Sequence, residues 1–191
     1  MEEISLEKIE TLVRTAQTNV NDAHAHYHQA VTTLSREFVE IKLQLCIFQY
    51  DICIEMANVI RNQPTGFAVS VALKGLVLRL FEFHLTVNQH LYPRLKALAA
   101  ARGIEIDDAT VRQLKREWKT ELTELQKWQD VRNKAAGHYD KDFPLQVELL
   151  EGLSYDHVMG VTVGFLHFSM AMLIILKDSG QGVAHDNRSR V

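Results

Sequence analysis

The chain has 191 residues, the size of one ordinary domain, and 47% of them are hydrophobic, which argues against a disordered chain. The 21 Lys and Arg residues against 24 Asp and Glu residues give a formal net charge of −3, which excludes non-specific coating of nucleic acid but not a small local site. Only three prolines and nine glycines occur, too few for the frequent turns of a β-rich fold, so an all-helical protein is expected.

The N-terminal segment has no Gly or Pro before Pro64, so we expect it to be helical. An apolar or small residue recurs every three or four positions from Ile9 to Ile52, which describes one helical face. A single helix of that length would measure on the order of 80 Å, long for one domain. We therefore expect either one long helix or two, with a break at 19–22 or at 32–35, where capping residues cluster.

Sparse Gly and Pro residues divide the rest of the chain into helices after a loop at 61–66. The predicted helices span 68–102, 109–136, 145–151 and a last segment from about 154–156 to Asp178. Pro93 is expected to kink the first of these, and Gly103 and Gly137 to end the first two. Residues 1–178 are thus predicted to form a single up-and-down bundle of four to five long helices, and 179–191 a disordered C-terminal tail.

The segment Val158–Leu176 holds 19 residues without a charge, near the length of a membrane span. It also contains polar residues, His167 among them, and a buried central helix produces the same pattern. We interpret it as a core helix. The chain opens without a signal-peptide pattern and has two cysteines, Cys46 and Cys53, so we expect a cytoplasmic protein without a membrane partner.

The predicted helix 109–136 places apolar and basic residues on opposite arcs. The apolar arc holds Val111, Leu114, Trp118, Leu122, Leu125 and Trp128. The basic arc holds Arg112, Lys115, Arg116, Lys119, Lys127 and Lys134. This arc could guide RNA, although a solvated helix face is the interpretation we favour. Arg132 differs from the other cations, because it points with the apolar residues.

An arginine on a buried face needs a partner, because an unpaired buried charge is costly. One interpretation is a structural ion pair with Glu121 or with an acid elsewhere. The other is chemical: Gly137 can turn the chain back at the helix end, so His138 could approach Arg132. Histidine moves protons near neutral pH, and arginine binds phosphate oxygens in a fork. Such a pair suits metal-free RNA cleavage, and a twofold dimer would supply a second pair.

The segment from Arg132 to His138 resembles the hallmark motif of the HEPN superfamily, which is Arg, a polar residue, and His after four to six intervening residues. Five residues intervene here, and Asn133 is the polar residue. The resemblance implies an all-helical bundle that dimerises with the motif at the interface, and a metal-independent endoribonuclease of the toxin–antitoxin or abortive-infection type, without a cofactor. It makes Arg132 and His138 the catalytic pair and Asn133 a supporting residue; Lys134 and Tyr139 are assigned to substrate binding.

Two details qualify this resemblance. Arg79 and His84 fit the shortest motif spacing, but they lie within a helix and have an apolar residue, Leu80, at the polar position. One HEPN branch carries a tyrosine two residues after the histidine as a modification target. Here that position is aspartate, and Tyr139 directly follows the histidine, so we do not carry that regulation over.

Three functions are therefore weighed. The leading hypothesis is a dimeric HEPN-type endoribonuclease acting on RNA in a stress or phage-defence setting, with a cognate antitoxin as a candidate partner. The alternative is a non-catalytic HEPN-like helical interaction module, an antitoxin or a scaffold. The third is a metal site on His24 and His28, which lie one turn apart; His26 points away, so solvated histidines and no metal are expected.

Overall fold

Every regular element in the described part of the chain is a helix, as predicted. The structure, a computed structural model, describes the backbone of residues 5–103, 108–136 and 142–186, and the side chains within 5–103, 112–135 and 142–177. In chain order the elements are α1 (Leu6–Gln29), α2 (Thr33–Asn62), α3 (Phe67–Thr86), η1 (Val87–Leu91), α4 (Tyr92–Ala100), α5 (Asp108–Glu117), α6 (Lys119–Lys127), η2 (Val131–Ala136), α7 (Phe143–Glu151) and α8 (Tyr155–Asp186).

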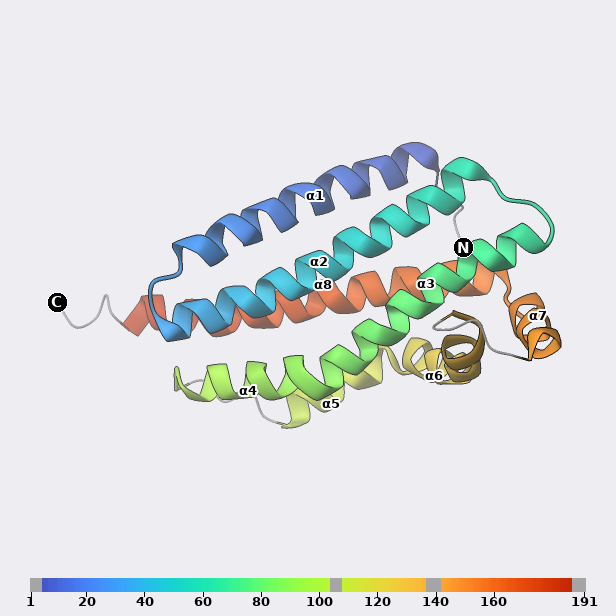
Figure 1. Ribbon diagram of the computed structural model, residues 1–191. Coiled ribbons are helices and arrows are strands. Elements are labelled where there is room, and N and C mark those ends of the chain that lie inside the picture. Colours follow the sequence, from blue (N-terminus) through green and yellow to red (C-terminus); the bar gives the residue numbers. More distant parts are fainter. Residues whose placement is uncertain (1–4, 104–107, 137–141, 187–191) are drawn as a thin grey trace.

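The long helices α1, α2, α3 and α8 form the bundle, and α2 lies at its centre (Figure 1). α2 packs against α1, α3 and α8, whereas α1 packs mainly against α2. α1 and α8 run in the same direction and α2 runs opposite to both (Figure 1). The shorter elements η2 and α7 pack against α3. One end of the bundle therefore carries the segment that contains the predicted motif.

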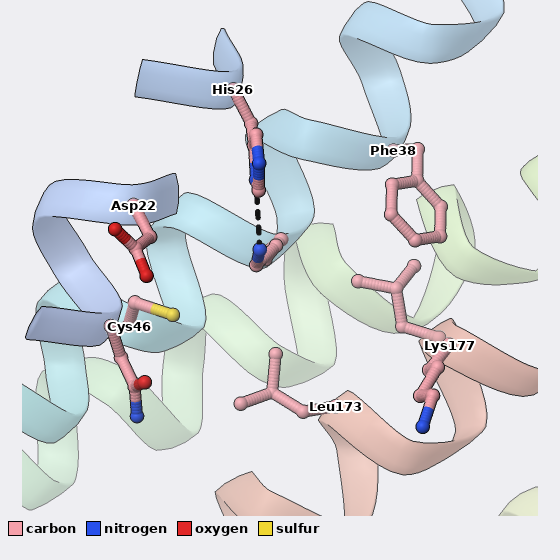
Figure 2. A pocket seen from close by; sticks show the side chains of 9 residues that line it. Asp22, His26, Phe38, Cys46, Leu173 and Lys177 are labelled. Carbon is pink, nitrogen blue, oxygen red and sulfur yellow. Dashed lines mark hydrogen bonds between the residues drawn. The ribbon is translucent and has the colours of Figure 1, made fainter. Parts of the chain in front are cut away.

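The N-terminal segment forms two helices, and the break lies at the second of the two predicted positions. Thr32 caps α2 in a capping box: its hydroxyl accepts from the Ser35 amide at 3.1 Å, and its own amide donates to the Ser35 hydroxyl at 3.1 Å. These two bonds satisfy amides at the start of α2, so α1 and α2 are separate helices. Lys42 Nζ of α2 also donates to His26 Nδ1 of α1 at 3.1 Å (Figure 2).

Two of the predicted helices are interrupted. At the predicted kink, the π-helical turn η1 lies just before Pro93, which cannot donate a backbone hydrogen bond. Gly103 follows the end of α4 with a left-handed φ of 72°. The prediction of one helix over 109–136 is wrong. The helix breaks at Trp118 and Trp128 before the π-helical turn η2. Each of these rings packs edge-on against an aromatic ring of α8.

The C-terminal part follows the prediction at its start and departs from it at its end. Asp142 caps α7 by accepting from the Leu145 amide at 3.2 Å. α8 begins at Tyr155 but continues to Asp186. The helix therefore extends past the predicted end at Asp178, into the segment expected to be a tail.

Two helices are long and apolar enough to cross a membrane by length and composition. They are Thr33–Asn62, with a mean hydropathy of 1.2, and Tyr155–Lys177, with 2.0. Half of the apolar window of each is buried inside the bundle, and Phe165 and Phe168 of α8 are among the largest fully buried side chains. Core helices of soluble proteins pass the same test, so these lengths are weak evidence for a membrane.

Candidate functional site

The π-helical turn η2 carries the first half of the predicted motif and is held between α3 and α7. Val131 and Ala135 are buried, which fixes one face of the turn on the core. The Gln146 amide of α7 is buried and donates to the backbone oxygen of Lys134 at 2.9 Å. Because both sides of η2 are anchored, the position of Arg132 within it is well defined.

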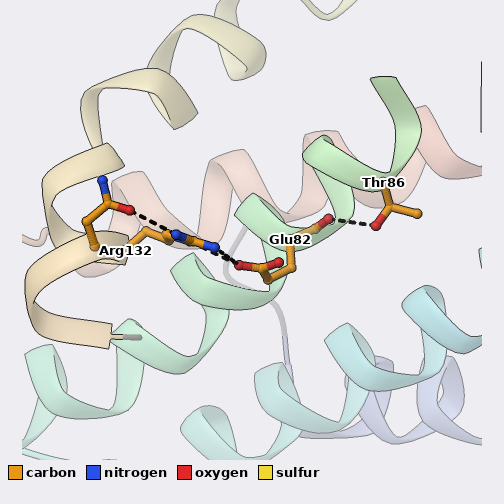
Figure 3. A network of polar contacts seen from close by, with 4 residues as sticks. Glu82, Thr86 and Arg132 are labelled. Atoms are coloured by element: carbon orange, nitrogen blue, oxygen red, sulfur yellow. Dashed lines mark hydrogen bonds and ion pairs between the residues drawn. The ribbon is translucent and has the colours of Figure 1, made fainter. Parts of the chain in front are cut away.

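Arg132 is held by two acceptors (Figure 3). Its Nη2 and Nε atoms donate to Oε1 of Glu82 on α3, at 2.6 and 3.0 Å. Its Nη1 atom donates to Oδ1 of the neighbouring Asn133 at 3.0 Å. The side chains of Arg132 and Glu82 are 35% and 50% exposed, so this ion pair lies at the surface rather than in the core.

This geometry corrects one expectation about Arg132 and identifies which acid is its partner. The side chain is half-buried and does not point into the core with the apolar arc. Its acid is Glu82 and not Glu121, which lies instead against Gly164 of α8. The reason is that the break at Trp128 and the π-helical turn change the rotation per residue. A wheel drawn at about 100° per residue therefore no longer describes this part of the chain.

The guanidinium keeps hydrogen-bonding capacity after these contacts. An arginine has five N–H donors, and three are used by Glu82 and Asn133 among the side chains that the structure describes. The terminal nitrogens therefore retain donors for an incoming oxyanion, in the forked geometry that suits phosphate. The nearest cation along the turn, Lys134, lies 4.0 Å from Asp130 and is 40% exposed.

The remaining predicted site residues divide into two groups. Asn133 is exposed and contacts Arg132, and Lys134 follows it on the same turn. Gly137, His138 and Tyr139 lie outside the described residues, so the proposed approach of His138 to Arg132 stays a prediction.

Glu82 is the residue that sequence reasoning missed. It lies 50 positions from Arg132, beyond the reach of any helical periodicity. The available signal was weak: Glu82 is the one acid of α3 and lies between Phe81 and Phe83.

The second Arg–His pair does not form a site. Arg79 is exposed, whereas His84 is half-buried with its ring edge-on to Phe165 at 6.4 Å. Burial, and to a smaller extent the charge of Lys115, lowers the pKa of His84, so its imidazole is neutral at pH 7. Five residues of helix place the two side chains on different faces, roughly 140° apart.

The histidines of α1 lie near its C-terminal end. His24 and His28 face each other with 3.0 Å between their Nε2 atoms. No third His, Cys, Asp or Glu joins them, and the residues described contain no group of three such ligands.

Comparison of the chain with family models, with curated proteins and with solved structures found no match. The function is therefore argued from the Arg132 site itself.

Proposed function

We propose that the protein is a cytoplasmic, metal-independent endoribonuclease of the HEPN type, active as a homodimer in a stress or phage-defence setting. The observation that carries this proposal is Arg132. It is half-exposed, oriented by Glu82 and Asn133, and keeps donors for an oxyanion, six residues before His138. Ordering an arginine in advance reduces the conformational entropy lost when it binds a phosphate.

The chemistry needs only side chains of this chain. A ribose 2′-hydroxyl attacks the adjacent phosphorus, so that an O2′–P bond forms and the P–O5′ bond breaks. His138 of one protomer removes the 2′-hydroxyl proton, and His138 of its partner protonates the departing O5′. Arg132 stabilises the charge that develops on the non-bridging oxygens. The products are a 2′,3′-cyclic phosphate and a 5′-hydroxyl.

The test is cleavage of labelled RNA by the purified protein in EDTA. His138→Ala and Arg132→Ala should each lower the cleavage rate by about 100-fold or more, the range lost with an acid–base or charge-stabilising group. Arg79→Ala and His90→Ala are matched controls, because both side chains are exposed and lie outside the motif. Cleavage that persists in His138→Ala, or that needs added metal, would contradict the proposal.

A second candidate is a non-catalytic helical interaction module, an antitoxin or a scaffold. It is favoured by the Glu82 carboxylate, which neutralises Arg132 before any ligand arrives. The two candidates differ in what Arg132→Ala does to folding. A half-exposed ion pair contributes about 0–1 kcal/mol. If Arg132→Ala loses activity and loses no more folding stability than this, the result supports the nuclease. If the wild type is inactive and Arg132→Ala loses more than about 3 kcal/mol of folding stability, the result supports the structural role.

A further inference from the structure

A long groove lies between α1 and α8, with α2 as its floor. It consists of two adjoining cavities of about 680 and 400 Å³, which share Asn19 and Leu173. The larger is mostly apolar, and the smaller contains most of the charged side chains. This groove is formed by elements other than η2, α3 and α7, which hold the Arg132 site.

The α8 wall presents a regular stripe of side chains to the groove. They are Val163, His167, Met170, Ile174 and Lys177, with spacings of four, three, four and three residues. Met170 and Ile174 are 54% and 58% exposed, although they are large and apolar. Alternating steps of four and three are the spacing of a helix that packs along another helix.

The other two walls repeat this spacing. α1 contributes Lys8, Leu12, Thr15, Asn19, Asp22 and His26. α2 contributes Lys42, Cys46, Gln49, Cys53 and Met56. Three helices thus direct heptad-spaced side chains into one space, as three members of a four-helix bundle do toward the fourth.

Two sets of contacts connect the helices that line the groove. On its floor, the buried Gln49 amide donates to the buried Ser169 hydroxyl at 3.0 Å, which ties α2 to α8. α1 meets α2 through a narrow row of buried residues, Ile9, Ala16 and Ala23, spaced seven apart. The α1 stripe from position 8 to position 26 measures roughly 27 Å and the α8 stripe roughly 21 Å, the length of a helix of about 14–18 residues.

Both ends of the groove carry cations: Lys8 lies at the end near the start of α1, and two lysines lie at the other end. The end near the C-terminal part of α1 carries the ammonium groups of Lys42 and Lys177 and the single carboxylate of Asp22 (Figure 2). Lys42 Nζ contacts the His26 ring rather than an acid. Neither lysine forms an ion pair with any carboxylate whose side chain is described. This end therefore has an unmet preference for a negative group.

A second copy of this chain is a poor match for the groove. A helix seated between three others needs apolar side chains over about half of its circumference. Outside the groove, the large exposed apolar side chains of the described helices occur only one or two to a helix. No described helix therefore offers such a face.

We propose that this groove binds one amphipathic α-helix of a different protein, with apolar residues at heptad spacing and an acidic residue at the end that meets Lys42 and Lys177. Burial of its apolar face against Met170, Ile174 and Leu12 provides the driving force. The two lysines set its direction in the groove. This proposal is independent of RNA cleavage.

The probe is a fluorescein-labelled synthetic helix of about 18 residues with Leu at heptad positions and Glu at one end, followed by fluorescence anisotropy. The wild-type protein should bind it at least about tenfold more tightly than a peptide of scrambled order. Met170→Glu and Ile174→Glu should each weaken binding by about tenfold or more. Both side chains are exposed, so both variants should fold. Phe143→Glu is the matched control, since Phe143 is 68% exposed outside the groove, and it should bind as the wild type does.

Direction is tested with a second peptide in which Lys replaces the terminal Glu residues. The wild type should prefer the Glu peptide, and the Lys42→Glu/Lys177→Glu variant should prefer the Lys peptide. Equal binding of heptad and scrambled peptides would overturn the proposal. Sedimentation equilibrium provides a second check. If the protein is a dimer that Met170→Glu converts to monomers and Phe143→Glu does not, a second copy occupies the groove and the proposal is overturned.

Discussion

The two cysteines show how burial alone changes the chemistry of a single residue. Cys53 is 3% exposed and Cys46 is 2% exposed, and both lie on the α2 floor of the groove between α1 and α8. Burial raises the pKa of the Cys53 thiol from 9.0 to about 11. Burial also raises the pKa of Cys46, and the charge of Lys42 offsets part of that effect. Both thiols are therefore protonated at neutral pH and poor nucleophiles.

This shift predicts a loss of stability in alkali. A raised native pKa means that the unfolded thiol deprotonates first, so native stability falls as the pH rises from about 9 toward 11. At pH 10.5 Cys53 should account for roughly 2 kcal/mol of the loss. Urea unfolding of the wild type and Cys53→Ala at pH 8 and pH 10.5 measures this. The variant should lose less stability between the two pH values, and an identical loss would contradict the prediction.

At the scale of elements, α6 packs against α8 at Gly164, a residue without a side chain. A Cβ atom added at Gly164 would lie 2.5 Å from Cγ of Glu121, closer than packed atoms approach. An alanine at position 164 would therefore require the Glu121 side chain to move. The same contact occupies Glu121, so this acid is directed toward α8 rather than toward Arg132.

Gly164→Ala is accordingly predicted to be destabilising, by about 1–3 kcal/mol, although alanine favours helix. Urea unfolding should show this loss and its recovery in Gly164→Ala/Glu121→Ala, where the clash is removed. Gly75→Ala on α3 is the matched control. Its added Cβ would lie 3.5 Å from Oε2 of Glu55, an ordinary contact, and it should be neutral or stabilising. A neutral Gly164→Ala would show that α6 moves away from α8 without cost.

At the scale of the whole molecule, stability is distributed unevenly. α1 buries three residues over its length, whereas α2 buries ten and contacts helices on several sides. A helix with so little buried surface separates from the bundle more easily than the core helices do. The groove that we propose as a docking site lies along this loosely held helix.

Amide hydrogen exchange is expected to show the difference. Amides of α1 should exchange about tenfold or more faster than those in the middle of α2 and α8 under native conditions, because α1 can open without global unfolding. Mass spectrometry of peptic fragments resolves the three helices. Equal protection of α1 and α2 would show that they unfold as one unit.

Local patterns in the sequence were sufficient for much of the architecture. The absence of turn residues predicted an all-helical protein, Thr32 and Ser35 marked one of two possible breaks, and Pro93 and Gly103 marked the ends around η1 and α4. The breaks at Trp118 and Trp128 were not predicted, because each depends on how a ring packs against α8.

For the candidate site, the sequence alone determined that Arg132 and Asn133 are neighbours on one helical turn, whereas its prediction that Arg132 points with the apolar residues was wrong. Only the tertiary structure decided that Glu82 orients it and that the heptad stripes of α1, α2 and α8 face one groove. Periodicity reports contacts between residues three or four positions apart, where the backbone itself sets the distance. Glu82 and Arg132, 50 residues apart, meet only because α3 and η2 pack against each other.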